Sequence, residues 1–337
     1  MPRRTTSLGL LLSTALAAAS CAHAPPAPAP APAATWPDSG PPRLRWAGEF
    51  PDPSIRREPP LWRRVLDAVV GLEEQGDSGR SALVRPFGVA AAGEKLLVAD
   101  PDGRRVLSVD FRTGAEEEIR CPKEWASPMA AAEAGGAVYV ADAGAGLLVA
   151  VRGGRCTEIG AGLMERPAAI AASGGRLYVV DPPRHAVLVF APGGELLSRF
   201  GSRGSEEGEV NFPTAIAAAP DGSLWVVDAL NFRVSHFTAD GKPLSSFGAP
   251  GDEKGEFSRP KAVAVDGRGR LYVSDAQRDA VLVFGPDGQF QYSFGETGSD
   301  PGQLSLPAGV AVAGDRVFVA DSYNHRVQQF AMVEGAP

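Results

Sequence analysis

The sequence is poor in the residues that most often build metal centres and active sites. Among its 337 residues are four histidines and three cysteines. His23 lies in a run of proline and alanine with no other ligand type nearby, so His185, His236 and His325 remain in the part of the chain that can fold. Zinc usually takes four ligands from one neighbourhood, and the sequence therefore offers little from which to assemble a metal centre.

Positive charge is also scarce. The chain has 33 Lys and Arg against 40 Asp and Glu, which gives a formal net charge of −7. Proteins that bind phosphate backbones cluster Lys and Arg on one surface, and no basic stripe is present in this sequence, so nucleic acid is not an expected partner. The hydrophobic fraction of 44% and the charged fraction of 22% are ordinary for a globular protein.

The N-terminal apolar run is too short to cross a bilayer as a helix. Residues 8–19 make about a dozen positions where a span needs about 20, and they follow Arg3 and Arg4, as in an export signal. The run ends in Ala-Ala-Ser before Cys21, which resembles the lipobox of bacterial lipoproteins. The resemblance implies that 1–20 is a signal peptide and that Cys21 is lipidated, and the alanine that follows resembles the pattern sorted to the outer membrane. The alternative is a plain secretory signal with an incidental cysteine.

Proline is concentrated behind this cysteine. Residues 22–42 alternate proline and alanine, a composition that favours an extended polyproline conformation over a helix or a sheet. We therefore expect 21–42 to be a lipidated tether that holds the folded part away from the membrane.

What the chain does contain is a sixfold repeat. In Pro260–Gly295, apolar runs at 262–265, 271–273, 281–284 and 290–294 are separated by Gly, Asp or Pro, which predicts four antiparallel strands. In each repeat a Pro opens the first strand and an Asp ends the second. The pairs are Pro86/Asp100, Pro128/Asp142, Pro167/Asp181, Pro213/Asp228, Pro260/Asp275 and Pro307/Asp321. Their spacing is typical of repeats that each build one four-stranded blade.

The sixth repeat lacks a fourth strand, because only residues 331–337 follow its third. We expect the strand-like run 43–50 to become the outer strand of that blade and to close the ring; the alternative is that 331–333 completes it. Apolar residues at helical spacing in 60–71 predict one short N-terminal helix. It lies within the insertion 51–85, and we expect it to dock at or beside the mouth of the ring's channel.

Three repeats also share a glycine-spaced segment before the first strand. The glycines stand at 201/204/208, 248/251/255 and 295/298/302. With Pro-x-x-[VI]-Ala, [LV]-[YFW]-[VI]-x-Asp and Asn-x-Arg-Val, these segments are similar to the NHL repeat. The resemblance covers 86–330 and implies an all-β fold, a six-bladed β-propeller of four-stranded antiparallel blades spanning 86–337. Together with the lipobox, the chain looks like the bacterial lipoproteins that carry such propellers.

The recurrent aspartates are expected to have a structural role. A short acceptor at a strand end binds the following turn, and in three repeats an arginine five positions later could pair with it in the blade. These arginines are Arg105, Arg233 and Arg326. The register expected for Cys121 and Cys156 on neighbouring outer strands disfavours a disulfide, although the sequence leaves their pairing open.

An enzymatic function would need converging polar groups at the channel mouth. Related six-bladed propellers include lyases and lactonases that bind metal there. The residues that follow the first-strand prolines are Phe87, Met129, Ala168, Thr214, Lys261 and Ala308, and the two histidines at a common turn position, His185 and His325, fall in opposite blades. We therefore predict no catalytic, cofactor-binding or metal-binding residues, and no cofactor.

The sequence favours a non-catalytic scaffold, monomeric and lipid-anchored in the cell envelope, that binds a protein or an envelope polymer. The alternative is a metal-dependent lyase or lactonase with its site at the channel mouth. The predicted contact residues lie on the strand-connecting face. They are Lys261, Thr214, Asn231, Arg233, Tyr323, Asn324, His325 and Arg326.

Overall fold

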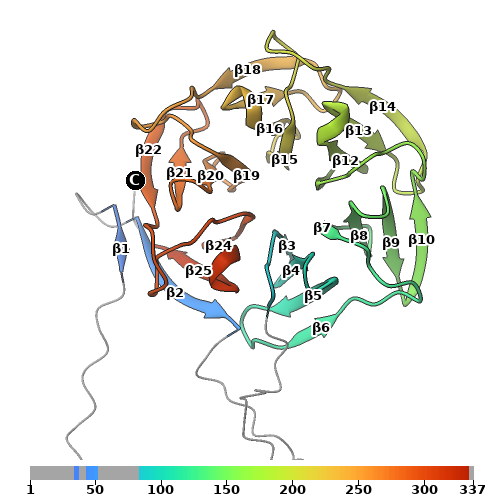
Figure 1. The fold of residues 1–337 in the computed structure, drawn as a ribbon, viewed down its shortest axis with the longest axis horizontal. Coiled ribbons are helices and arrows are strands. Elements are labelled where there is room, and N and C mark those ends of the chain that lie inside the picture. The colour runs from blue at the N-terminus through green and yellow to red at the C-terminus, as the bar shows by residue number, and fades with distance from the viewer. Residues whose placement is uncertain (1–33, 38–42, 52–82, 334–337) are drawn as a thin grey trace, which may run out of the picture. The chain divides into compact units, whose positions relative to one another are not determined.

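Six antiparallel β-sheets surround one axis and form a six-bladed β-propeller (Figure 1). The computed structural model describes residues 34–37, 43–51 and 83–333. Among these residues there is no α-helix, only three short 3-10 helices. They are η1 (Pro182–Arg184), η2 (Ala229–Asn231) and η3 (Ser322–Asn324). The helix expected over 60–71, the signal peptide and Cys21 lie outside the described residues.

Blades one to five each contain four strands, in order from the axis outwards. Blade one is β3 (Gly88–Ala92), β4 (Lys95–Asp100), β5 (Arg105–Asp110) and β6 (Glu116–Glu118). Blade two is β7 (Pro128–Ala134), β8 (Ala137–Asp142), β9 (Leu147–Arg152) and β10 (Arg155–Ile159). Blade three is β11 (Ala169–Ser173), β12 (Arg176–Asp181), β13 (Ala186–Phe190) and β14 (Leu196–Phe200). Blade four is β15 (Pro213–Ala218), β16 (Leu224–Asp228), β17 (Arg233–Phe237) and β18 (Pro243–Phe247). Blade five is β19 (Pro260–Val265), β20 (Leu271–Asp275), β21 (Ala280–Phe284) and β22 (Phe290–Phe294).

Blade six combines both ends of the described chain. Its inner strands are β23 (Val310–Ala313), β24 (Arg316–Asp321) and β25 (Arg326–Met332), and outside them lie β2 (Leu44–Phe50) and β1 (Thr35–Trp36). The segment expected to close the ring is β2, which pairs antiparallel with β25 from Leu44↔Met332 to Phe50↔Val327. Residues 331 and 332 lengthen β25 instead of forming a strand of their own. The blade has five strands rather than the expected four because β1 adds to β2.

The core lies between the blades. Neighbouring inner strands contact one another around the ring, and β23 returns to β3. Side chains that alternate along each strand pack against the next sheet, as where Val226, Val187 and Tyr178 join one cluster. Burying a Val, Leu or Phe side chain contributes about 1.5–3 kcal/mol, so the flat, apolar blade faces supply most of the stabilisation.

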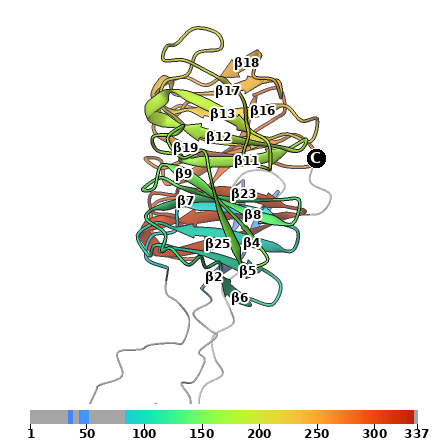
Figure 2. The same cartoon turned by 90° about the vertical axis from the view of Figure 1, so that its right-hand side faces the viewer.

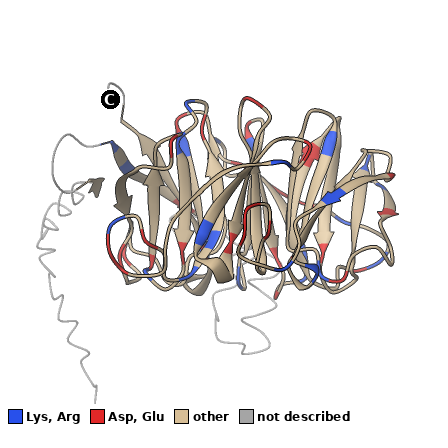
Figure 3. Ribbon diagram, turned by 90° about the horizontal axis from the view of Figure 1, so that it is seen from above, with Lys and Arg blue, Asp and Glu red and all other residues tan. Residues whose placement is uncertain are grey.

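The strands run across the depth of the ring, so the connections lie on its two faces (Figure 2). Lys, Arg, Asp and Glu lie mainly on these connections (Figure 3). One face carries the ends of the second strands with their aspartates, and we call it the turn face. We call the segment that leads into the first strand of each blade its lead-in.

Each recurrent aspartate fixes the lead-in of its own blade. All six side chains are buried, with exposures of 0–3%. In blade two, for example, Asp142 accepts the backbone N–H groups of Ala126 and Ser127 at 2.8 Å each. The predicted ion pairs are confirmed: Arg105, Arg233 and Arg326 lie 3.0, 2.8 and 2.8 Å from the aspartate of their blade. Charge-assisted hydrogen bonds of this kind contribute about 1.5–3 kcal/mol each.

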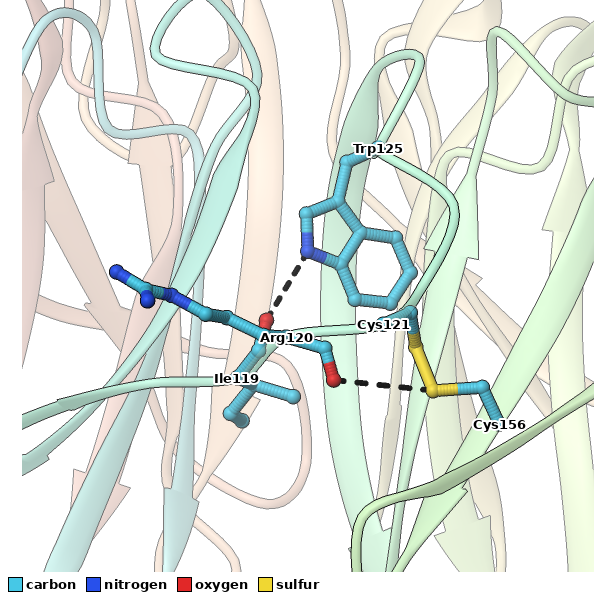
Figure 4. The surroundings of a disulfide bond; sticks show 5 residues. All are labelled: Ile119, Arg120, Cys121, Trp125 and Cys156. Atoms are coloured by element: carbon cyan, nitrogen blue, oxygen red, sulfur yellow. Dashed lines mark hydrogen bonds between the residues drawn. A yellow bond between two sulfur atoms is a disulfide. The ribbon is translucent and has the colours of Figure 1, made fainter.

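Cys121 and Cys156 form a disulfide, and the expectation that their register keeps them apart was wrong. Their Cα atoms are 5.9 Å apart. Cys121 is not on an outer strand, because β6 ends at Glu118 and the chain then crosses to blade two. There it reaches Cys156 on β10, while the indole N–H of Trp125 donates to the Ile119 carbonyl at 3.1 Å (Figure 4).

Candidate functional site

The channel mouth on the turn face is ringed by the residues that follow the first-strand prolines. Five of the six positions, those of Phe87, Met129, Ala168, Thr214 and Lys261, are half-buried, and the sixth, Ala308, is buried. The collar is apolar apart from one hydroxyl and one ammonium.

Lys261 is the charged member of this collar and sits on β19 of blade five. Its backbone carbonyl accepts a hydrogen bond from the Thr214 hydroxyl at 3.0 Å, which ties blade four to blade five. Burial lowers the pKa of the Lys261 ammonium from its ordinary value, and the nearby charge of Arg259 lowers it further. No carboxylate among the described residues pairs with it. The site therefore holds a partly dehydrated cation whose charge favours an anionic ligand.

Four of the predicted contact residues donate their hydrogen bonds inside the protein. The Asn231 amide donates to Asp228 and to the Gly204 carbonyl, both at 2.8 Å. The Arg233 guanidinium donates to the carbonyls of Ser205, Glu206 and Glu209. Blade six repeats this arrangement. Asn324 donates to Asp321 and to the Gly298 carbonyl. Arg326 donates to the carboxylates of Asp321 and Glu49 and to the carbonyls of Asp300 and Gln303. These side chains clamp the glycine-spaced lead-ins.

The other two predicted contact residues lie beside the blade-six clamp. Tyr323 on η3 is 54% exposed. His325 follows it in the left-handed region with φ 58°, and its Nδ1 donates to the Val84 carbonyl, which ties blade six to the lead-in of blade one. The structure thus groups 323–326 at blade six and Asn231 with Arg233 at blade four, with Lys261 in the blade between them.

The histidines do not meet. His185 accepts a hydrogen bond from the Phe212 N–H at its Nδ1, 3.1 Å away, and so joins blade three to blade four. Among the described residues, no three His, Cys, Asp or Glu side chains are grouped so that they could hold a metal ion. Asp266, an acid at the far end of β19, is paired with Arg270 at 2.7 Å.

One polar cluster was not predicted from the sequence. His236 on β17 stacks on Trp225, with ring centroids 3.8 Å apart and planes 1° from parallel. The Ser223 hydroxyl donates to Asp221 at 2.6 Å, so the His236 Nε2–H donates to Ser223 at 2.8 Å. Burial lowers the pKa of His236 below its ordinary value. The sequence signal for this cluster was the placement of Trp225 and His236 opposite each other on two neighbouring strands.

Residues 304–330, which contain β23, β24 and most of β25, match the NHL repeat family. The protein is thus a six-bladed β-propeller that carries an NHL repeat. No curated protein matches the chain, and no helix in the described part is long and apolar enough to cross a membrane.

Solved structures share the architecture. Virginiamycin B lyase from Staphylococcus aureus is 12% identical with a TM-score of 0.56, over 74% of this chain and 96% of that one. A gluconolactonase from Xanthomonas campestris is 18% identical with a TM-score of 0.55, over 74% and 86%. Regucalcin from Agrobacterium tumefaciens, a calcium-binding protein, is 15% identical with a TM-score of 0.58, over 76% and 93%. At these identities the likeness shows the fold alone.

Proposed function

We propose that the protein is an exported, lipid-anchored β-propeller that acts as a non-catalytic scaffold and binds a protein or an envelope polymer through its turn face. Lys261 is the observation that carries this proposal. It is the one charged side chain of the channel-mouth collar, it is half-buried, and it pairs with no carboxylate in the described part of the chain. Cations in such positions are normally paired, and a carboxylate of the partner would complete the pair.

The disulfide supports export. Structural disulfides persist in oxidising compartments and are rare in the cytosol, and Cys121 and Cys156 are bonded in this protein. Export agrees with the signal-like residues 1–20 and with lipidation at Cys21, which would place the scaffold in the cell envelope, at the outer membrane.

Crosslinking in cells tests the turn face directly. A photoreactive amino acid in place of the exposed Tyr323 should trap the partner, and Lys261→Glu should reduce the adduct at least tenfold because it reverses the charge at the channel mouth. The matched control is Lys242→Glu, the same reversal on an exposed lysine of the β17–β18 hairpin on the opposite face. Equal adduct in both variants would remove Lys261 and this face from the proposal.

The alternative is a metal-dependent lyase or lactonase, which the architecture shared with such enzymes favours. The described collar does not fit a metal ion, because Phe87, Met129, Ala168 and Ala308 offer no hard oxygen or imidazole ligand and Lys261 repels a cation. Metal analysis of the purified full chain discriminates: stoichiometric zinc or calcium would favour the enzyme over the scaffold.

A further inference from the structure

A cavity of about 320 Å³ lies on blade two, beside the disulfide. It is bounded by the blade-two lead-in and by β9 and β10, and its lining includes Trp125, Leu147, Val149 and the buried carboxylate of Asp142. The volume falls at the lower end of the range for ligand sites, about 300–1,000 Å³. The cavity is at the outer part of one blade and is separate from the collar that contains Lys261.

The strand register shows what stands at this place in the other blades. The residue opposite the recurrent aspartate on the third strand is Leu147 in blade two. In blades one, four and six the same register position holds Arg105, Arg233 and Arg326. In blades three and five it holds alanine, and there an arginine stands two positions earlier instead, Arg184 and Arg278.

In blades four to six these arginines lie beneath the lead-in and bind its carbonyl oxygens. Arg233 donates to three of them, Arg326 to Asp300 and Gln303, and Arg278 to Glu253 and Glu256 at 3.1 and 3.2 Å. In blades one, three, four and six the guanidinium also pairs with the buried aspartate. In each of the five other blades, an arginine at one of these two positions therefore binds the buried aspartate, the lead-in carbonyls or both.

Blade two has no arginine at either position, since Ala145 and Leu147 occupy them. The space opens into the cavity, and Asp142 forms no ion pair with any described residue. None of the hydrogen bonds among the described residues ends on the carbonyl oxygens of 121–124, whereas the matching carbonyls of blades four to six accept from arginine. The disulfide and a hydrogen bond from Arg104 of blade one to the Trp125 carbonyl, 3.2 Å long, hold this lead-in, and blade two places no arginine of its own beneath it.

The lining is negatively charged. It includes three carboxylates, those of Asp142, Glu124 and Glu158, and one ammonium, that of Lys123, which pairs with Glu158 at 3.1 Å. Two negative charges are left in excess, one of them on the side chain of Asp142, which is only 3% exposed. A low-dielectric concave site of one charge sign attracts the opposite charge.

We propose that this cavity binds the guanidinium of an arginine side chain supplied by a partner protein. The partner's arginine takes the place that the chain's own arginines occupy in the five other blades. Its aliphatic part packs against Leu147 and Val149, and its planar head pairs with Asp142 and the lead-in carbonyls. The indole of Trp125, which is 4% exposed, lies in the wall of the cavity beside it.

A pair of peptides tests the charge requirement. Acetyl-Gly-Arg-Gly-amide is titrated into the full chain with ¹⁵N-labelled tryptophan, and its citrulline counterpart, which has the same shape without the charge, is titrated in parallel. The indole resonance of Trp125, assigned with Trp125→Phe, should shift saturably with the arginine peptide, and affinity for the citrulline peptide should be at least tenfold lower. Equal affinities, or no saturable shift, would overturn the proposal.

Two variants fill the cavity from inside. Ala145→Arg and Leu147→Arg reproduce the two positions at which other blades carry arginine, and each should reduce peptide affinity at least tenfold. Gln277→Arg adds the same charge to an exposed turn position of blade five and should leave affinity unchanged within twofold. Ala145 is only partly buried, so its variant keeps the test valid if Leu147→Arg does not fold. A folded Ala145→Arg protein that still binds the peptide would refute the site.

Discussion

Blades two and four solve one problem in two ways. Each must hold its lead-in against the end of its second strand, and each uses a buried aspartate to do so. Blade four adds a polar clamp, in which Arg233 and Asn231 donate hydrogen bonds to four carbonyls of the lead-in. Blade two adds the Cys121–Cys156 bond. With the disulfide in place, blade two has no arginine of its own beneath the lead-in. A cavity lies where Arg233 stands in blade four.

Blades two and four diverge at the lead-in and keep the same pairing between their second and third strands. The register between the second and third strands is the same in both blades: Asp142 pairs with Leu147 in blade two, and Asp228 pairs with Arg233 at the same position in blade four. The attachment of the lead-in differs. A change in how the lead-in is held leaves the core of the blade intact. A site can therefore be added to one repeat without disturbing the fold.

Removing the clamp of blade four should have the largest effect on stability. Arg233→Ala leaves Asp228, which is fully buried, without its cation and leaves three carbonyls without their donor. Breaking a buried pair by deleting one partner costs about 3–5 kcal/mol. Urea unfolding monitored by circular dichroism measures the loss.

Arg184→Ala in blade three is the matched control for this clamp. Arg184 is 41% exposed and lies 3.4 Å from Asp181, so its removal should cost under about 1 kcal/mol. Similar losses for Arg184→Ala and Arg233→Ala would show that burial of the ion pair does not set its contribution.

Removing the covalent attachment of blade two should have a smaller effect. The disulfide closes a loop with a sequence separation of 35, and native disulfides typically contribute about 2–4 kcal/mol. Cys121→Ser with Cys156→Ser should therefore lower the free energy of unfolding by about that amount. Hydrogen exchange should accelerate in 119–127 and in β10, and the lead-in of blade four should keep its protection. Loss of protection throughout the ring would contradict the local role.

The regular part of this fold could be predicted from the sequence, and the exceptions could not. The Pro-to-Asp spacing and the apolar runs predict six sheets because each run must bury the same faces. The ion pairs of Arg105, Arg233 and Arg326 followed from one recurrent spacing. The disulfide was missed because β6 has only three residues, which a pattern of four equal strands does not reveal.

The candidate sites show the same limit. Lys261 stood out in the sequence as a charge among apolar positions, and the structure shows it in an apolar collar. For Asn231, Arg233, Asn324 and Arg326 the sequence did not reveal the bonds to backbone carbonyls, because those carbonyls belong to lead-in residues more than 20 positions away. The blade-two cavity could not be predicted, because it forms where Ala145 and Leu147 replace the arginines of the other blades. These positions can be recognised as equivalent only after the strand register has aligned the blades.

Blades two and four also differ in one strand pair, and this pair should make the stability of blade four depend on pH. At the register position where blade four has Trp225↔His236, blade two has Tyr139↔Ala150, so blade four carries a titrating group that blade two lacks. Burial holds the pKa of His236 below its ordinary value of 6.5. The unfolded chain therefore takes up a proton near pH 6.5, and the folded chain takes it up only at lower pH. In that interval the unfolded state binds more protons, so stability is lost as pH falls below about 6.5.

His236→Phe removes this proton and keeps a ring against Trp225. The wild-type midpoint of urea unfolding should fall more between pH 7.5 and pH 5.5 than that of the variant. Asp221, whose pKa is lowered mainly by its bonds from Ser223, loses its charge only in more acidic solution and does not contribute in this range. The difference should be small, because His236 is only partly buried. Identical pH dependence in the two proteins would show that the stacked imidazole titrates alike in the folded and unfolded chain, and that blades two and four do not differ in their response to acid.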